Sequence, residues 1–121
     1  MINRKSLIAL VALCFFVPRN GHAYSGHDLF ADCNKVNQME SAFCLGFIFG
    51  FFEASAMNGG RVLRDNTSER MYCMPAQTPS LGQIRDAVIQ MMGRHPQVRN
   101  GPAAFSVAIS LELAFPCGAR R

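Results

Sequence analysis

The chain has 121 residues, of which 50% are hydrophobic and 17% are charged, so it can bury a core and is not disordered throughout. The formal net charge is +4, but three of the twelve basic side chains, Arg4, Lys5 and Arg19, stand in the first 23 residues. The remaining 9 basic and 8 acidic side chains leave a charge of +1, which argues against a nucleic-acid-binding domain, because phosphate binding needs clustered Lys and Arg.

Residues 1–23 have the pattern of a secretory signal peptide. A basic segment at 1–5 precedes an apolar run at 6–18, and Gly21 and Ala23 put small residues at positions −3 and −1 of a cleavage site before Tyr24. We therefore expect a signal peptide over 1–23 and a mature domain over 24–121, exported to the periplasm.

Two other interpretations of this segment are less favourable. A membrane anchor is disfavoured because the uninterrupted apolar stretch at 7–17 is too short to span about 30 Å of hydrocarbon. A lipoprotein is disfavoured because Leu13, directly before Cys14, is too large for the cleavage site of a lipoprotein signal. A product without a membrane anchor is therefore expected.

The residues 25–35 form the first predicted helix. Leu29, Phe30 and Cys33 have helical spacing, Ser25 is a candidate N-cap, and Asp28 at the third helical position suits the positive helix end.

The second predicted helix covers 38–57 and ends at the Asn-Gly-Gly sequence 58–60. Its centre, 42–52, is apolar on every side, which predicts burial between other helices or in a subunit interface rather than a membrane span. Gly46 and Gly50 lie four residues apart, and in a soluble protein this spacing predicts tight helix packing.

A polar connection of about 20 residues follows, between Gly59 and Pro79, and it is longer than most connections in a compact domain. The composition is equally compatible with a functional loop and with a solvated linker held by Cys73. The sequence 66–68 also matches an N-glycosylation acceptor. Charged side chains make this connection the candidate partner-binding segment, and the residues are Arg61, Arg64, Asp65, Glu69 and Arg70.

Two more helices are expected in the C-terminal third. The first covers 80–94, with a capping box formed by Ser80 and Gln83. The second covers 102–115 and is ended by Pro116. Apolar side chains at helical spacing should face the core, and these are Leu81, Ile84, Val88 and Met91 in the first helix, and Ala104, Val107, Ala108, Leu111 and Phe115 in the second. No segment has a strand period, so we predict an all-α fold, a small disulfide-stapled bundle of about four main helices.

Four cysteines remain in the mature chain, Cys33, Cys44, Cys73 and Cys117, and an even number in a small exported domain predicts two disulfides. A zinc site is disfavoured because the intervening stretches of 10, 28 and 43 residues lack the close pairs that structural zinc uses.

The order of the helices selects one of the three connectivities. The helices 80–94 and 102–115 are joined by a short connection and should run antiparallel, which brings Cys73 close to Cys117. Cys33 and Cys44 can meet across the first helical hairpin. We predict the pairs Cys33–Cys44 and Cys73–Cys117.

No catalytic set is evident. His27 and His95 each suit a helix cap or a surface position, the thiols are better used as bridges, and no serine has a nucleophile-elbow context. We therefore expect a binding protein with no catalytic residue, no metal site and no cofactor, and we give a small enzyme little weight.

Four sequence elements together resemble one family. These are CLGFIFG at 44–50, YCMP at 72–75, HP at 95–96 with AA at 103–104, and FPC at 115–117. In this order and spacing they are similar to type VI secretion immunity proteins of the Rap/Tai kind, over most of the mature chain.

The resemblance implies a small helical, disulfide-bonded periplasmic protein, commonly a homodimer, that protects bacteria against a peptidoglycan-amidase effector. It also implies that a loop between helices enters and blocks the active-site cleft of the effector. The matched positions are structural residues, so the choice of Arg61, Arg64, Asp65, Glu69 and Arg70 rests on the length and charge of the connection alone. The alternative is a periplasmic binding or envelope-stress module with the same fold and no toxin partner.

Overall fold

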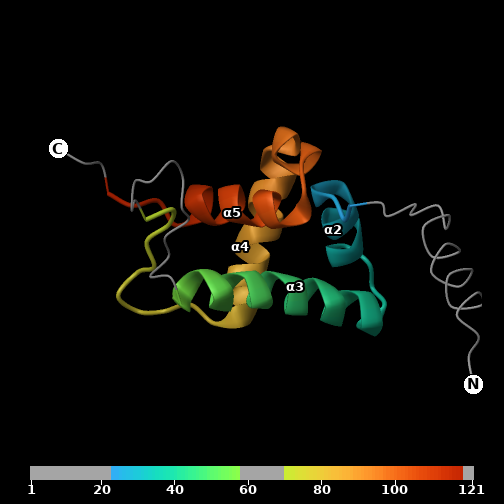
Figure 1. Ribbon diagram of the computed structural model, residues 1–121. Coiled ribbons are helices and arrows are strands. Elements are labelled where there is room, and N and C mark those ends of the chain that lie inside the picture. The colour runs from blue at the N-terminus through green and yellow to red at the C-terminus, as the bar shows by residue number, and fades with distance from the viewer. Residues whose placement is uncertain (1–22, 58–69, 119–121) are drawn as a thin grey trace, which may run out of the picture.

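The computed structural model describes residues 23–57 and 70–118, and this part of the chain contains α-helices and one 3₁₀ helix but no β-strand. In chain order the elements are α2 (Gly26–Cys33), α3 (Gln38–Met57), α4 (Leu81–Arg94), η1 (Pro96–Asn100) and α5 (Ala103–Ala114), as Figure 1 shows. The predicted all-α fold is confirmed.

Two of the helices begin at capping boxes, of which the one at α4 was predicted, while at α2 the prediction was Ser25 as the N-cap. At the start of α2 the Asp28 amide donates to the Ser25 hydroxyl over 3.2 Å, and the Ser25 amide donates to the Asp28 carboxylate over 3.0 Å. Ser80 and Gln83 exchange the same two hydrogen bonds, over 3.3 and 2.8 Å, at the start of α4. Each box satisfies backbone N–H groups that the first helical turn leaves without partners.

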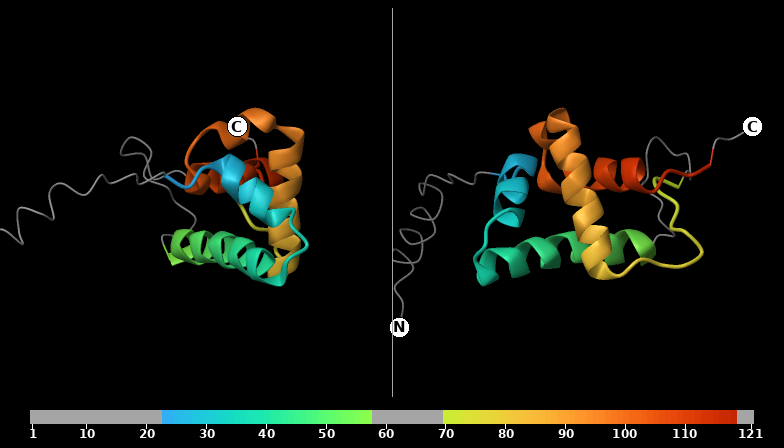
Figure 2. Two further views of the ribbon diagram at one scale, coloured as in Figure 1. Left: turned by 90° about the vertical axis from the view of Figure 1, so that its right-hand side faces the viewer. Right: turned by 180° about the vertical axis from the view of Figure 1, so that it is seen from behind.

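The helices are not stacked as a parallel bundle, because α4 crosses both α3 and α5 at a steep angle (Figures 1 and 2). The antiparallel arrangement predicted for α4 and α5 is therefore wrong. The connection between them is not a simple loop either, since it folds into η1 with Pro96 at its start, and η1 packs on α2, α4 and α5. This packed turn redirects the chain, so that α5 leaves across α4 rather than back along it.

Both predicted disulfides are present. Cys33–Cys44 joins the end of α2 to α3 with a Cα–Cα distance of 5.1 Å, and Cys73–Cys117 joins the segment before α4 to the residues after α5 with a distance of 4.8 Å. The second bridge does not need antiparallel helices, because residues 74–80 carry the chain from the end of α5 to the start of α4.

The core lies where α2, α3 and α5 meet α4. Its fully buried side chains include Leu29 of α2, Ile48 of α3 and Leu111 of α5. In α4 the buried side chains are Ile84, Val88 and Met92, so the predicted stripe is wrong at both ends. Leu81 is exposed and Met91 only half-buried, because α4 crosses its neighbours and its buried positions follow a strict four-residue step. Ala104 of α5 is likewise exposed, while Val107 and Ala108 are buried as predicted.

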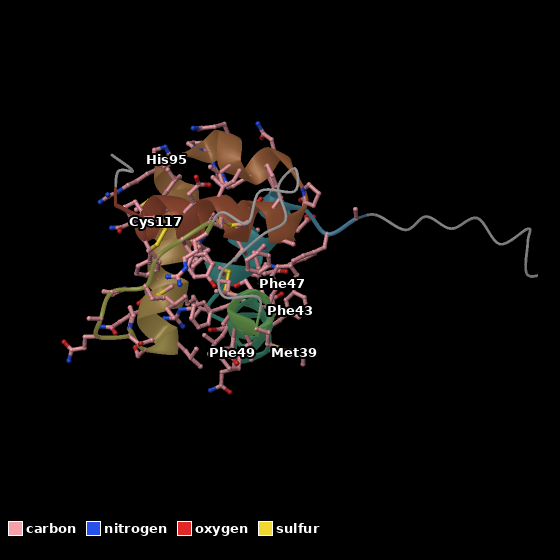
Figure 3. All side chains as sticks on the ribbon, turned by 60° about the vertical axis from the view of Figure 1, so that its left-hand side comes forward. Met39, Phe43, Phe47, Phe49, His95 and Cys117 are labelled. Carbon is pink, nitrogen blue, oxygen red and sulfur yellow. A yellow bond between two sulfur atoms is a disulfide. The ribbon has the colours of Figure 1, made fainter. Side chains whose placement is uncertain are left out.

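Of the two expectations for the apolar centre of α3, burial on all sides between other helices of this chain is wrong, and burial in a subunit interface stays a prediction. Its buried residues are Cys44, Ile48 and Ser55, on the face toward the core. On the opposite face Met39 and Met57 are 79% and 88% exposed, and Phe43 is 50% exposed (Figure 3). A Cβ atom added at Gly46 or Gly50 would meet nothing within 4 Å, so these glycines do not pack against another described helix of the chain.

The close packing of α2 against η1 depends on Gly26. Gly26 starts α2 and donates its amide to the Gly101 carbonyl over 2.9 Å. A Cβ atom at Gly26 would lie 2.1 Å from Ser106 Oγ and 2.8 Å from Arg99 Cα, so the backbones of α2 and η1 must move apart to admit one.

We expect Gly26→Ala to lower the free energy of unfolding by about 1–3 kcal/mol, the usual effect of overpacking a closely packed contact. Urea unfolding of residues 24–121 measures this value. Gly82→Ala is the matched control, because a Cβ atom at Gly82 would come no closer than 4.0 Å to Ser80 Oγ. Equal stability of the two variants would contradict the close approach of α2 to η1.

Candidate functional site

Four of the five predicted partner-binding residues, Arg61, Arg64, Asp65 and Glu69, lie outside the described residues. The fifth, Arg70, is exposed at the point where the described chain resumes. The structure does describe the residues on either side of this segment. These are the last turns of α3 and the residues from Arg70 to Cys73.

The first contact between these ends is polar. The hydroxyls of Ser55 in α3 and Tyr72 are joined by a short hydrogen bond, and both residues are buried. The Ser55 hydroxyl also donates to the Phe52 carbonyl over 2.8 Å, one turn earlier in the helix. The Tyr72 ring stacks on Phe52 with 6.1 Å between the ring centroids. Tyr72 is thus fixed to α3 at both its ring and its hydroxyl.

The second contact ties the returning chain to the end of α5. The Cys73 amide donates to the Phe115 carbonyl over 2.9 Å, and the Cys73–Cys117 bridge lies beside this hydrogen bond. We refer to Ser55, Tyr72, Cys73, Phe115 and Cys117 as the loop base. Through the loop base, residues on both sides of 58–69 are anchored to the helical core, and this is how a fixed scaffold presents a binding segment.

An aromatic cluster occupies the other end of α3. The Tyr24 ring lies edge-on to Phe43, with 5.4 Å between centroids, and is tilted against Phe47 at 5.6 Å. Its backbone carbonyl accepts a hydrogen bond from the Ala103 amide over 3.0 Å. Tyr24 is the expected first residue of the mature chain, so signal-peptide cleavage at the expected position would leave the new N-terminus packed on the domain.

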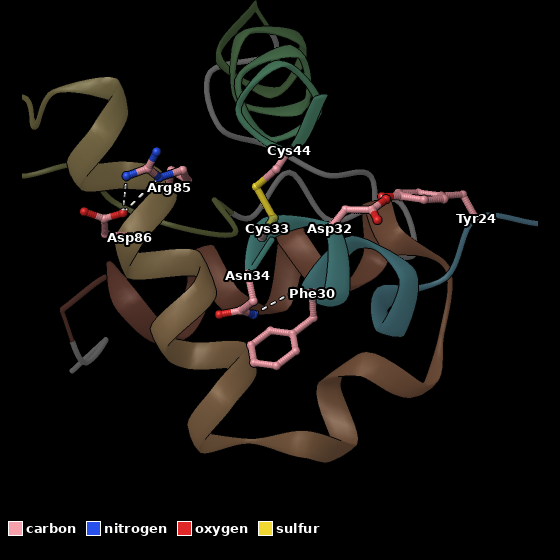
Figure 4. The surroundings of a disulfide bond; sticks show 8 residues. All are labelled: Tyr24, Phe30, Asp32, Cys33, Asn34, Cys44, Arg85 and Asp86. Atoms are coloured by element: carbon pink, nitrogen blue, oxygen red, sulfur yellow. Dashed lines mark hydrogen bonds and ion pairs between the residues drawn. A yellow bond between two sulfur atoms is a disulfide. The ribbon is translucent and has the colours of Figure 1, made fainter. Parts of the chain in front are cut away.

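The Tyr24 hydroxyl also takes part in a polar network beside the Cys33–Cys44 bridge (Figure 4). It donates to Asp32 Oδ2 over 2.6 Å, and Lys35 Nζ lies 2.9 Å from Asp32 Oδ1 and 3.0 Å from Glu40 Oε1. Partial burial and the bond to Asp32 raise the pKa of Tyr24 well above its usual value. The hydrogen bonds from Tyr24 and Lys35 lower the pKa of Asp32.

This network predicts a pH dependence of stability. Because the folded-state pKa of Asp32 lies below its unfolded value, its contribution is present above the ordinary aspartate pKa of about 4 and is lost as pH falls through the lowered folded value. The urea concentration at the midpoint of unfolding should fall between pH 6 and pH 2.5 in both proteins. We expect this fall to be smaller in Asp32→Asn than in wild type. Asp86→Asn on α4 is the control, and an equally small fall in both variants would contradict this assignment.

His27 and His95 do not form a catalytic set with the residues described around them. His27 Nε2 lies 3.1 Å from Asn100 Oδ1 on the exposed surface, and His95 follows the last turn of α4 (Figure 3). In the described ranges, no group of three or more His, Cys, Asp or Glu side chains could hold a metal ion.

A hollow of about 520 Å³ opens between the segment before α4 and the end of α5. Its lining contains no acidic, basic or imidazole side chain, and the residues are Gln77, Thr78, Pro79, Gln83, Ala87 and Phe115. This lining offers no group for acid–base chemistry at neutral pH.

Sequence reasoning missed two parts of this arrangement. The Ser55–Tyr72 hydrogen bond joins residues 17 positions apart, and a serine within an apolar helix gives no indication of its partner. The packing of Tyr24 against Phe43 and Phe47 of α3 was also missed, because the local sequence around Tyr24 does not indicate which helix it meets.

A family model described as Rap1a immunity proteins matches residues 25–117, which is more than half of the chain and includes the described helices and the loop base. No curated protein and no solved structure matches the chain.

Proposed function

The chain belongs to the Rap1a immunity protein family, and from this membership we propose that it binds a peptidoglycan amidase, delivered by the type VI secretion system of a neighbouring cell, and blocks its active-site cleft. Membership of the family makes it an immunity protein against a secreted effector. The amidase activity of that effector and the mode of inhibition are parts of the proposal. The observation that carries it is the family match over residues 25–117.

The loop base supports inhibition by an inserted segment. A segment that enters a cleft loses less conformational freedom on binding when its ends are already fixed. The Ser55–Tyr72 hydrogen bond and the Cys73–Cys117 bridge restrict such ends here. We assign the binding contacts to Arg61, Arg64, Asp65, Glu69 and Arg70, of which Arg70 is exposed beside the loop base. Arginine is common among the side chains that dominate protein interfaces.

We place this action in the periplasm, with residues 1–23 removed as a signal peptide and 24–121 as the active domain. Two observations support this. The sequence has the signal-peptide pattern, and the four cysteines after the predicted cleavage site are all paired in disulfides. Disulfides form and persist in oxidising compartments such as the periplasm.

The inhibition we propose is stoichiometric and needs no reaction by this chain. Immunity proteins of this kind are generally not enzymes. The described histidines and the hollow beside α5 supply no nucleophile paired with a base. We also propose that the protein is a homodimer, with specificity for one effector residing in loop side chains.

The test is capture of partners by the oxidised mature protein from the secreted and periplasmic proteins of its own organism, followed by mass spectrometry. We expect recovery of a small amidase, and we expect Arg61→Glu/Arg70→Glu to recover much less of it. Recovery of envelope proteins alone, equally by both proteins, would overturn the amidase proposal in favour of a binding module without a toxin partner.

A further inference from the structure

The two disulfides of this chain have different surroundings, and the first difference is their place in the fold. Cys33 ends α2 and Cys44 lies within α3, so this bridge holds two helices together. Cys73 and Cys117 both lie outside the helices, in the segment before α4 and in the residues after α5. Figure 2 shows these two segments side by side beyond the end of α5. The Cys73–Cys117 bridge therefore lies at the edge of the domain.

The second difference is exposure. Cys44 is 1% exposed, so its sulfur is closed to a reagent in solution. Cys73 and Cys117 are both partly exposed, and Cys117 Sγ lies 3.9 Å from the Arg70 carbonyl at the surface. A thiolate must reach a sulfur atom to break a disulfide. Both residues of Cys73–Cys117 are open to such an approach, whereas one residue of the other bridge is buried.

Charge is the third difference. Beside the bridge between α2 and α3, the carboxylates of Asp32 and Glu40 outnumber the Lys35 ammonium that pairs with both of them. Figure 4 shows Asp32 next to that bridge. An excess of negative charge repels an approaching thiolate. At the other bridge, the Arg70 backbone contacts Cys117 and the Arg70 side chain is exposed, and partly exposed cysteines near a cation are the reactive ones in proteins.

We propose that Cys73–Cys117 is a site of thiol–disulfide exchange with a dithiol reductant, while Cys33–Cys44 is a structural bridge. A dithiol is the class of reductant that frees itself from the protein, because its second thiol completes the exchange. The length of the loop that a bridge closes acts on the unfolded chain, whereas the rate of reduction of the folded chain depends on access to the sulfurs. The bridge that stabilises the fold more is therefore also the one that is reduced faster.

The exchange takes place in two steps. A thiolate of the reductant attacks Cys117 Sγ, forms a bond to it and expels the Cys73 thiolate, which takes up a proton. The second thiol of the reductant loses its proton and attacks the reductant's own sulfur in this mixed disulfide, so that the Cys117 thiolate leaves and is protonated. The bridge gains two electrons and two protons, and the reductant is oxidised to its disulfide.

Reduction loosens the loop base and leaves the core in place. The covalent link to the end of α5 is lost, and the hydrogen bond from the Cys73 amide to the Phe115 carbonyl remains. The core around Leu29, Ile48 and Leu111 includes neither Cys73 nor its partner in the bridge. Inhibition of the effector is then strong in the oxidised protein and weak in the reduced protein. This second part rests on the proposed function, and it confines inhibition to an oxidising compartment.

The first test follows reduction of the folded, oxidised protein, residues 24–121, by dithiothreitol. Samples are alkylated with iodoacetamide over time and digested, and the labelled cysteine peptides are quantified by mass spectrometry. We expect Cys73 and Cys117 to be labelled about tenfold faster than Cys33 and Cys44, because exposure and charge both favour attack there. Equal rates, or faster labelling of Cys33 and Cys44, would overturn the exchange site.

The matched control is the same reaction in guanidinium chloride. Unfolding opens both bridges to the reductant, so the two rates should become similar. A tenfold difference that persists in the unfolded chain would contradict an exchange site created by the fold.

The second test measures what selective reduction does to the protein. The form alkylated at Cys73 and Cys117 is desalted, so that no reductant reaches the amidase, and is compared with untreated protein by circular dichroism and by inhibition. We expect an unchanged helical spectrum and inhibition weaker by about tenfold, because a segment with a released end loses more conformational freedom on binding. Loss of the helical spectrum, or equal inhibition by the two forms, would overturn the second part.

Cys73→Ser/Cys117→Ser is the control for the added alkyl groups. It lacks both the bridge and the alkyl groups, and it should inhibit as weakly as the alkylated form. Inhibition by this variant at the wild-type level would assign the weakening to the alkyl groups and overturn the second part.

The exchange site and the proposed function fail separately. Selective labelling of Cys73 and Cys117, with no amidase inhibited by the oxidised protein, would overturn the proposed function and leave the exchange site in place. Inhibition by the oxidised protein, with Cys33 and Cys44 labelled first, would overturn the exchange site and leave the amidase proposal in place.

Discussion

Removing the Cys73–Cys117 bridge with Cys73→Ser/Cys117→Ser is expected to lower the free energy of unfolding by about 4 kcal/mol. The bridge closes a loop with a sequence separation of 44, which restricts the unfolded chain more than the separation of 11 closed by Cys33–Cys44. For a domain of about one hundred residues this is a large part of a typical total stability of about 5–15 kcal/mol. Urea unfolding at neutral pH, followed by circular dichroism, measures the loss.

The comparison variant is Cys33→Ser/Cys44→Ser, for which the same loop-closure argument gives about 3 kcal/mol. Loss of Cys73–Cys117 should also weaken inhibition of the effector, because this bridge belongs to the loop base and Cys33–Cys44 does not. A larger loss of stability in Cys33→Ser/Cys44→Ser would contradict the argument that the disulfide closing the longer loop stabilises the fold more. Equal inhibition by both folded variants would contradict the role of the loop base.

Reversing charge in the proposed binding segment should have the largest effect on function. We expect Arg61→Glu/Arg70→Glu to weaken inhibition of the amidase by about 100-fold or more, since dominant interface residues each contribute about 2 kcal/mol or more. The reversal also places acidic side chains opposite any acidic surface that the arginines contact, which adds repulsion. Inhibition curves at fixed amidase concentration give the change in affinity.

Arg85→Glu/Arg94→Glu on α4 makes the same change of net charge away from the loop base. Arg85 is paired with its neighbour Asp86 over 2.7 Å, and Arg94 is exposed in the last turn. This control should inhibit within a few-fold of wild type, with both variants giving the wild-type circular dichroism spectrum. Equal weakening by the two variants would show a general charge effect and would contradict binding through residues 58–70.

Much of the fold could be predicted from local signals. Ser25 with Asp28 and Ser80 with Gln83 fix two helix starts, because a capping box acts within one turn of the chain. Both disulfide pairs were predicted correctly, but the antiparallel helices from which Cys73–Cys117 was argued are not present, and residues 74–80 bring the two cysteines together instead. The capping boxes depend on residues three positions apart, and a disulfide requires only that its two cysteines come within bonding distance.

Features that depend on tertiary geometry were not predicted. The steep crossing of α4 over α5 arises from the packed η1 turn, which a short connection with Pro96 does not distinguish from an ordinary loop. For α3 the sequence left two coverings open, other helices of the chain or a subunit interface, and the structure excludes the first on one face. A helix apolar all round indicates burial, but it does not tell whether the second surface belongs to the same chain or to another copy.

The position of the candidate site in the sequence could be predicted, but the contacts that hold it could not. Length and charge point to the connection after α3, but the hydrogen bond that holds its base joins Ser55 to Tyr72 across 17 residues. Recognition residues in such segments vary with the partner and carry no local pattern. The structure places Arg70 at the surface beside the loop base.

The central claim is that this protein inhibits a secreted amidase by binding it, and titration of the amidase captured from the same organism tests this most directly. Hydrolysis of purified peptidoglycan is measured while the oxidised mature protein is added in increasing amounts. We predict a linear fall in activity that reaches its floor at one copy of this chain per amidase molecule. Full hydrolysis at a several-fold molar excess of the protein would contradict the account.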